Sequence, residues 1–352
     1  MTLENRLIAF EKIGLFLAQF TTPTFKKNAA EDLNNTYFEA FSMQLKRQCE
    51  FNAWFTLDQL NYACKNWSES LTASNLNHWT SAYTLDKNTS KTIAIIMAGN
   101  IPLVGFHDFI SVLISGHKVL VKQSHHDKHL LPLLAKYLEF IAPEFKECIR
   151  FSDEKLDGFD AVIATGSNNT ARYFDYYFGK YPNIIRNNRN SVAILTGAET
   201  EAELNLLGED IFTYFGLGCR NVSKLFVPKN YNFDLFFKAI YPFNNLISNQ
   251  KYQNNYDYNK AVYLMSLFKL LENGFLMLKE DTSYASPIAS LFYEYYDDLE
   301  QLETKLALDS DKIQCIVKQG LNKKAVAFGK TQKPHLWDYA DGVDTLAFLQ
   351  NL

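Results

Sequence analysis

The chain has 352 residues, of which 47% are hydrophobic and 21% are charged, and its formal net charge is −4. This length suits one large or two medium domains, and the apolar content suffices for a sizeable core. The slight negative charge gives no reason to expect a nucleic-acid partner, and the modest share of Gly and Pro argues against long disordered regions.

The first 86 residues predict helices. Apolar side chains recur over residues 3–20 with the spacing of an amphipathic helix, and similar patterns fill residues 36–86 with breaks near Thr56 and Ser74. Charged residues interrupt the first helix, so we expect no signal peptide, and no apolar run is long enough to span a bilayer. We interpret residues 1–90 as a helical region that packs on a sheet. The alternative is a lid or acyl-binding surface.

The sequence pattern changes at Lys91, where short apolar segments begin to alternate with helical patterns. This alternation predicts βαβ units and a parallel sheet that is covered on both faces. Helices are expected after Pro102, over 126–141 and 168–179, and over 200–215. The strands are expected in KTIAIIMAG (91–99), KVLVKQS (118–124), DAVIA (160–164), SVAIL (191–195) and Ser223–Pro228.

Beyond Pro228 the pattern is looser. We expect mostly helix over 231–272 and 297–308, and a short helix in 342–352. The remaining strands are expected at 275–279, 288–296, 312–318 and 324–328.

Polar residues follow three of the predicted strands, at 98–102, 122–127 and 165–170. Parallel sheets bind ligands at the carboxyl ends of their strands, so these stretches predict a nucleotide site. The chain contains no G-x-G-x-x-G sequence, so an ordinary Rossmann fingerprint does not support that site.

The stretch FTYFGLGCRNVSKLFVP, residues 212–228, places a thiol at a glycine-rich bend between a helix and a strand. Gly216 and Gly218 permit backbone angles and close approaches that a Cβ would block. Arg220 adds a positive charge, which favours a thiolate at Cys219. The alternative is a buried, inert cysteine at the end of a helix. The five cysteines are odd in number and lack metal-site spacing, which predicts no disulfide, no metal and a reducing cytoplasmic location.

Read together, AGNIP (98–102), VLVKQS (119–124) and FGLGCRNVSKLFVP (215–228) resemble the aldehyde dehydrogenase superfamily. They are most similar to its acyl-CoA reductase branch, typified by the fatty acyl reductase component of bacterial luciferase systems. The resemblance covers 91–228 and implies an α/β, aldehyde-dehydrogenase-like fold. It implies a parallel-sheet dinucleotide-binding domain (91–215), a shortened α/β catalytic domain (216–328) and a tail (329–352) that packs back.

The resemblance also implies a reaction. The Cys219 thiolate attacks an acyl-CoA or acyl-carrier thioester, Asn100 and the Cys219 N–H donate to the oxyanion, and reduction of the acyl-enzyme releases an aldehyde. The glutamate by which acid-forming relatives activate water is replaced near Arg186, and a second superfamily glutamate falls near Ser283. The alternatives are a CoA-acylating aldehyde dehydrogenase and a non-catalytic acyl- or nucleotide-binding subunit. A homo-oligomer or a complex with a partner enzyme is expected.

The resemblance assigns the strand-end Lys122 to the adenosine ribose. His125 stands where NAD-preferring relatives often carry a carboxylate, and Ser124 can donate to a 2′-phosphate, so we predict NADPH (NADP) as the cofactor. The alternative is that His125 and His126 are solvated loop residues. Thr165, Gly166 and Ser167 open a helix and could meet the pyrophosphate with N–H groups, or could simply include an N-cap.

Overall fold

The structure is a computed structural model that describes residues 1–28, 34–86, 89–319 and 325–352. The chain separates into two compact units. The first unit contains Met1–Asn187 and His335–Leu352, and the second contains Asn188–Pro334. Each unit is built around its own sheet.

The first sheet is wholly parallel and has the strand order β3-β2-β1-β4-β5. Its central strands are the short apolar segments that the sequence predicts, and their side chains alternate between two apolar clusters. Ile93 and Ile95 of β1 join the cluster on one face, and Ala94 joins the cluster on the other. The strands are β1 (Thr92–Ile96), β2 (Lys118–Lys122), β3 (Ile149–Phe151), β4 (Ala161–Thr165) and β5 (Asn183–Arg186).

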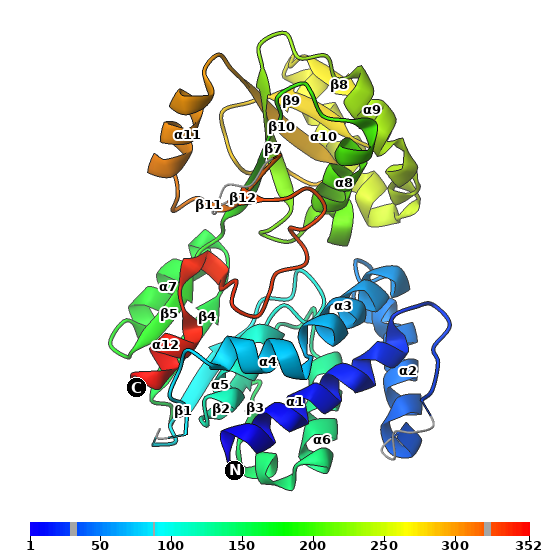
Figure 1. The fold of residues 1–352 in the computed structure, drawn as a ribbon. Coiled ribbons are helices and arrows are strands. Elements are labelled where there is room, and N and C mark those ends of the chain that lie inside the picture. Colours follow the sequence, from blue (N-terminus) through cyan, green and yellow to red (C-terminus); the bar gives the residue numbers. More distant parts are fainter. Residues whose placement is uncertain (29–33, 87–88, 320–324) are drawn as a thin grey trace. The chain divides into compact units, whose positions relative to one another are not determined.

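Helices cover both faces of this sheet (Figure 1). The N-terminal helices share one core with α5 and α6, while α7 packs on the opposite face through Phe174 and Phe178. Helices α1, α3 and α4 start at threonine N-caps, Thr2, Thr56 and Thr72, whose hydroxyls accept backbone N–H groups. The helices are α1 (Leu3–Leu17), α2 (Asn34–Phe51), α3 (Leu57–Ser70), α4 (Ala73–Thr80), α5 (Phe106–Ile114), α6 (Leu130–Ile141) and α7 (Asn168–Phe178).

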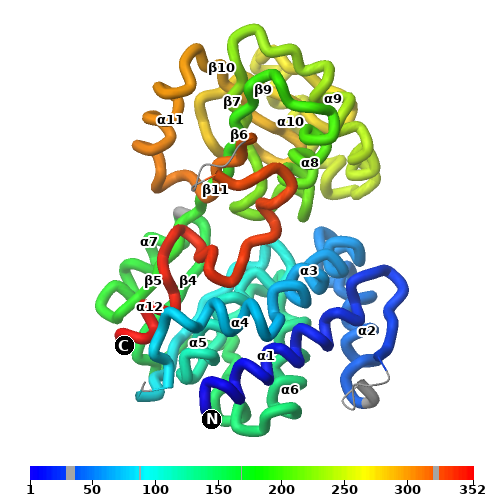
Figure 2. The backbone as a smooth tube through the Cα atoms, in the orientation of Figure 1, coloured from blue at the N-terminus to red at the C-terminus, as the bar shows by residue number. Residues whose placement is uncertain are grey.

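The C-terminal segment belongs to the first unit, as its red trace in Figure 2 shows. Its helix α12 (Thr345–Gln350) contacts α5. Two histidines of the first unit hold its backbone. The partly buried His107 has its Nε2 2.8 Å from the Leu336 carbonyl, and the buried His117 has its Nε2 2.9 Å from the Leu349 carbonyl. Tyr339 accepts a hydrogen bond of 2.7 Å from the Trp79 indole. The tail is thus tied to the helical layer along most of its length.

The second sheet is mixed and has the order β12-β11-β6-β7-β10-β9-β8, with β8 and β9 as its antiparallel pair. Helices α8 and α9 cover one face, and α11 covers the other. The strands are β6 (Asn190–Ile194), β7 (Val222–Pro228), β8 (Leu270–Glu272), β9 (Met277–Glu280), β10 (Ser290–Tyr296), β11 (Ile313–Lys318) and β12 (Ala325–Val326). The helices are α8 (Glu201–Phe212), α9 (Asp234–Ile240), α10 (Gln250–Met265) and α11 (Leu299–Leu308).

The boundary between the units differs from the expected one. The expected dinucleotide-binding domain (91–215) includes 191–215, but β6 pairs with β7 and β11 of the second sheet. The second unit therefore begins at Asn188, not at 216. A strand's own residues do not specify which neighbours it will pair with, so the alternation of strands and helices could not reveal this change of sheet. The expected strand at 324–328 is seen only at Ala325–Val326, and Lys324 lies outside the described residues.

Within the described ranges, the structure holds no helix with the length and apolar content that crossing a membrane requires.

Candidate functional site

The carboxyl ends of three strands meet at one edge of the first sheet. Strand β1 lies between β2 and β4, and Ile96 is level with Lys122 on one side and Ala164 on the other. The three polar stretches therefore leave the sheet side by side, which confirms that part of the prediction. The chain runs from β1 towards β2 and later returns to the other side of β1 at β4, so this edge is a topological switch point, the usual place for a ligand in such sheets.

The loop after β1 carries Asn100, which is exposed. The loop is fixed to the loop after β2 at two points. A Cβ at Gly99 would lie 2.5 Å from Ser124 Oγ, so only glycine fits there. Leu103 has a left-handed backbone, φ 56°, and donates its N–H to Asp127 Oδ2 at 2.7 Å. The backbone on both sides of Asn100 is therefore held in place.

Asp127, which the sequence analysis did not single out, holds the loop that carries Asn100. Its side chain is buried, and burial raises the pKa of this carboxyl to about 7, although the hydrogen bond from Leu103 opposes the shift. Among the described residues Asp127 Oδ1 has no hydrogen-bond partner. The only signal in the sequence is an acid three residues beyond Ser124, which is common in exposed loops and does not reveal burial.

The predicted cofactor residues Lys122, Ser124 and His125 lie at the end of β2. Lys122 is partly buried, and its ammonium donates to the Glu154 carbonyl at 3.0 Å, in the loop after β3. Ser124 Oγ accepts the His126 N–H at 3.3 Å. His125 is exposed. The structure thus brings a cation, a hydroxyl and an imidazole to the edge that also carries Asn100.

Thr165, Gly166 and Ser167 connect β4 to α7. Ser167 is the N-cap of α7 and accepts the Thr170 N–H at 3.2 Å, so the N-cap interpretation is confirmed. Gly166 packs so closely on the helix that an added Cβ would lie 2.9 Å from the Phe174 ring. The first N–H groups of α7 therefore start at the same edge of the sheet, where a helix N-terminus favours an anion.

Arg186 ends β5 and makes a buried, bidentate ion pair with Asp108 of α5. Its Nη1 lies 2.5 Å from Asp108 Oδ2 and its Nη2 lies 2.9 Å from Asp108 Oδ1. Arg186 Nη2 also lies 3.2 Å from Thr345 Oγ1 of α12. The stretch 184–191 contains no carboxylate, but the fold brings Asp108 to Arg186, and both of its oxygens are occupied by the guanidinium.

Cys219 lies in the second unit and is exposed. The expected helix over 200–215 ends at Phe212, because the chain then enters the left-handed region at Tyr214, Phe215 and Gly216 with φ of 54°, 57° and 76°. Such angles cost about 1–2 kcal/mol for each residue that carries a Cβ. Strain of this kind persists only where surrounding contacts hold it, and it gathers at functional sites.

The turn that carries Cys219 is anchored on both sides. The Asn221 N–H donates to the Gly218 carbonyl at 3.0 Å, and Ser191 Oγ donates to the Cys219 carbonyl at 3.0 Å. Arg220 Nε lies 2.5 Å from the Thr331 carbonyl and donates to it. The inert, buried alternative for Cys219 does not hold, whereas Cys64 and Cys315 are buried and burial raises the pKa of Cys64 to about 12. Cys49 is exposed as well.

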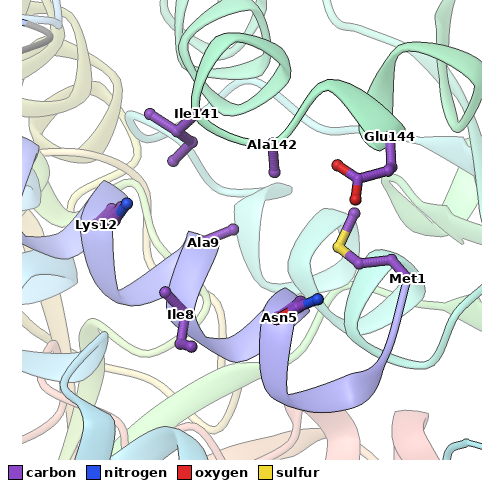
Figure 3. A pocket seen from close by; sticks show the side chains of 8 residues that line it. All are labelled: Met1, Asn5, Ile8, Ala9, Lys12, Ile141, Ala142 and Glu144. Atoms are coloured by element: carbon purple, nitrogen blue, oxygen red, sulfur yellow. The ribbon is translucent and has the colours of Figure 1, made fainter.

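The described residues contain no group of three or more His, Cys, Asp or Glu side chains that could hold a metal ion. A pocket of about 170 Å³ lies between α1 and the end of α6 (Figure 3). Asn5, Lys12 and Glu144 supply its polar lining, and none of the predicted site residues contributes to it.

No protein-family model and no curated protein sequence matches the chain. Its structure, however, is similar to solved structures of aldehyde dehydrogenases. Aldehyde dehydrogenase 21 from Physcomitrella patens, in complex with the reaction product succinate, matches with a TM-score of 0.63 and 14% identity over 92% of this chain and 75% of that one. An NAD⁺ complex of aldehyde dehydrogenase from Bacillus cereus matches with a TM-score of 0.62 and 13% identity over 92% and 73%.

A third match is the NAD-dependent aldehyde dehydrogenase from Sinorhizobium meliloti, with a TM-score of 0.61 and 12% identity over 94% of this chain and 72% of that one. At these identities the likeness concerns the fold. It confirms the predicted fold class: this chain has an aldehyde-dehydrogenase-like α/β fold with a helical N-terminal region.

Proposed function

We propose that this protein reduces an acyl-CoA or a related acyl thioester to an aldehyde with a nicotinamide cofactor, through an acyl group bound covalently to Cys219. The observation that carries the proposal is the exposed thiol on a strained turn whose backbone is anchored on both sides. The aldehyde-dehydrogenase-like fold and the motif resemblance support the same chemistry. The acyl-CoA reductase branch is our inference from the residues around Cys219 and Asn100.

The residues at the edge of the first sheet fit a dinucleotide. Lys122 supplies a cation, Ser124 supplies a hydroxyl, and α7 begins there after Thr165, Gly166 and Ser167. Together they suit a ligand that carries phosphates and a ribose. Two of the structural matches support a nicotinamide dinucleotide as that ligand, since one is an NAD⁺ complex and another is named as NAD-dependent.

In the proposed reaction the Cys219 thiolate forms a C–S bond with the acyl carbon, and the bond to the sulfur of coenzyme A breaks, so a coenzyme A thiolate leaves. The Asn100 amide and the Cys219 N–H donate to the oxygen as its negative charge develops; the loss of one such donor typically costs about 10²-fold or more in rate. The nicotinamide, when bound, supplies the hydride that reduces the acyl-enzyme. Collapse of the resulting thiohemiacetal releases the aldehyde and restores the thiolate.

The ion pair of Arg186 and Asp108 supports reduction over hydrolysis. Hydrolysis of the acyl-enzyme needs a base that accepts a proton from water. Arg186 stands where the resemblance places that base and cannot accept a proton, and the carboxylate of Asp108 is held by two bonds from Arg186. The acyl-enzyme should therefore persist until it is reduced or returned to a thiol.

The function is tested by trapping the acyl-enzyme. The wild-type protein is incubated with radiolabelled acyl-CoA without nicotinamide, and the labelled peptide is identified by mass spectrometry. We expect one acyl group, on the peptide that contains Cys219, and release of labelled aldehyde once NADPH is added. A protein that takes up no label with any chain length tried would be an acyl- or nucleotide-binding subunit instead.

We propose NADPH as the preferred cofactor, because a 2′-phosphate would meet Lys122, Ser124 and His125, and His125 stands where NAD-preferring relatives often carry a carboxylate. We expect fluorescence titration to give at least about tenfold tighter binding of NADPH than of NADH. His125→Asp should reduce this preference about tenfold, since a carboxylate repels the phosphate. His126→Asp changes the neighbouring histidine, which is also exposed, and is the control. A tenfold preference of the wild type for NADH would contradict the assignment.

A further inference from the structure

We propose that Asn221 is a positioning residue whose side-chain amide joins the end of α8 to the turn that carries Cys219. The inference rests on the proposed role of Cys219 as the nucleophile. Asn221 itself is buried, at 3% exposure, and stands two residues after the thiol. It lies just before β7, so its backbone is fixed by the second sheet.

The Asn221 side chain uses both ends of its amide. Its Oδ1 accepts the Gly218 N–H at 2.8 Å, immediately before Cys219. Its Nδ2 lies 3.0 Å from the Asp210 carbonyl, 3.3 Å from the Ile211 carbonyl and 2.8 Å from the Thr213 carbonyl. One side chain therefore binds the backbone before the left-handed residues, and also the backbone after them.

These contacts provide hydrogen-bond donors for the backbone carbonyls at the end of α8. The last carbonyls of a helix have no partner within the helix and must find donors elsewhere when they are buried. In α8 the Asn221 amide is such a donor, and it holds the carbonyls of Asp210 and Thr213 while the chain passes through Tyr214, Phe215 and Gly216. Without it, the strained segment loses the contacts that keep it from relaxing.

Neither aspartate nor leucine can replace the amide. An aspartate keeps the acceptor for Gly218 but would face the three carbonyls with oxygen atoms, and leucine offers neither donor nor acceptor. Asp210 braces the same region from the other side, because its carboxylate accepts the N–H groups of Gly329 and Thr331 at 2.7 and 2.9 Å. The Thr331 carbonyl in turn accepts from Arg220. Asn221 thus completes a set of bonds that surrounds Cys219 within the second unit.

The test compares Asn221→Ala with Asn205→Ala. Asn205 is a second side-chain amide of the same unit, which donates to the Ala239 carbonyl at 3.0 Å and does not bond to the turn. Hydrogen exchange followed by mass spectrometry reports on the peptide that contains Gly218, and this measurement needs no activity. We expect Asn221→Ala to speed exchange of the turn about tenfold or more and Asn205→Ala to leave it unchanged.

The second measurement separates positioning from a general loss of structure. We expect acylation of Cys219 by acyl-CoA to slow about 10- to 100-fold in Asn221→Ala, since a misplaced nucleophile loses rate. Alkylation of Cys219 by iodoacetamide, a small reagent that needs no positioning, should change less than about threefold. Equal losses in both reactions, or unchanged exchange at the turn, would overturn the proposal. Should the alanine variant fail to fold, Asn221→Asp serves in the same comparison.

The two measurements also keep this inference apart from the proposed function. If the wild type is never acylated, the reductase proposal fails, while the exchange experiment still decides whether Asn221 holds the turn. If the wild type is acylated and Asn221→Ala is acylated at the same rate, the reductase proposal stands and the positioning role of Asn221 is wrong.

Discussion

Replacement of Cys219 by alanine should abolish acyl transfer and aldehyde formation. The proposed reaction has no route without a covalent acyl group, and loss of a nucleophile in comparable enzymes costs on the order of 10⁴- to 10⁶-fold in rate. The expected result is no radiolabel on Cys219→Ala after incubation with acyl-CoA, and no oxidation of NADPH above the background rate. The fold should persist, because the side chain is exposed and its removal leaves no cavity.

Cys49→Ala is the matched control for this experiment. Cys49 is also exposed, but it lies on α2 of the first unit and has no anchored turn around it. We expect its replacement to leave acylation and reduction within about twofold of the wild type. If Cys219→Ala still takes up label and Cys49→Ala does not, the nucleophile is Cys49 on α2, and the assignment of Cys219 is wrong.

Among the substitutions proposed for this protein, removal of Arg186 should lower the unfolding free energy most. Arg186→Met leaves the Asp108 carboxylate buried without its partner, and breaking a buried ion pair in this way costs about 3–5 kcal/mol of unfolding free energy. The bond from Arg186 to Thr345 is lost as well, so α12 also loses a contact with β5. Urea denaturation followed by circular dichroism measures the change in unfolding free energy.

The control is an exposed pair of the same unit. Lys65 and Glu69 lie one turn apart on α3 with their charged atoms 3.9 Å apart and more than half exposed, so Lys65→Met should cost no more than about 0.5 kcal/mol. The double variant Arg186→Met with Asp108→Leu removes both charges and should recover a large part of the loss. A cost for Arg186→Met no larger than that for Lys65→Met would show that the buried pair contributes little.

Most elements could be predicted because their apolar side chains repeat with a clear period. The central strands β1, β2 and β4 are short apolar runs, and α1 and α6 have one apolar face. The short strands β3, β5 and β8 were missed. They have only three or four residues, they are partly exposed, and they give no signal until a neighbouring strand pairs with them.

The candidate site shows the same division. Asn100, Lys122, Ser124 and Cys219 stand out because they follow strands or glycines in a familiar order. Their supporting residues do not stand out. Asp127 resembles any loop acid and Asn221 any polar residue after a turn, yet one holds the Asn100 loop and the other holds the Cys219 turn.

The amino-acid sequence by itself determined the alternation of strands and helices, the fold class and the residues that end each central strand, because these depend on neighbours a few positions away. Only the tertiary structure decided the sheet to which β6 belongs and the pairing of Asp108 with Arg186 across 78 positions. Those outcomes depend on which distant surfaces meet when the chain folds, and a residue's type and local spacing carry no record of its distant partner.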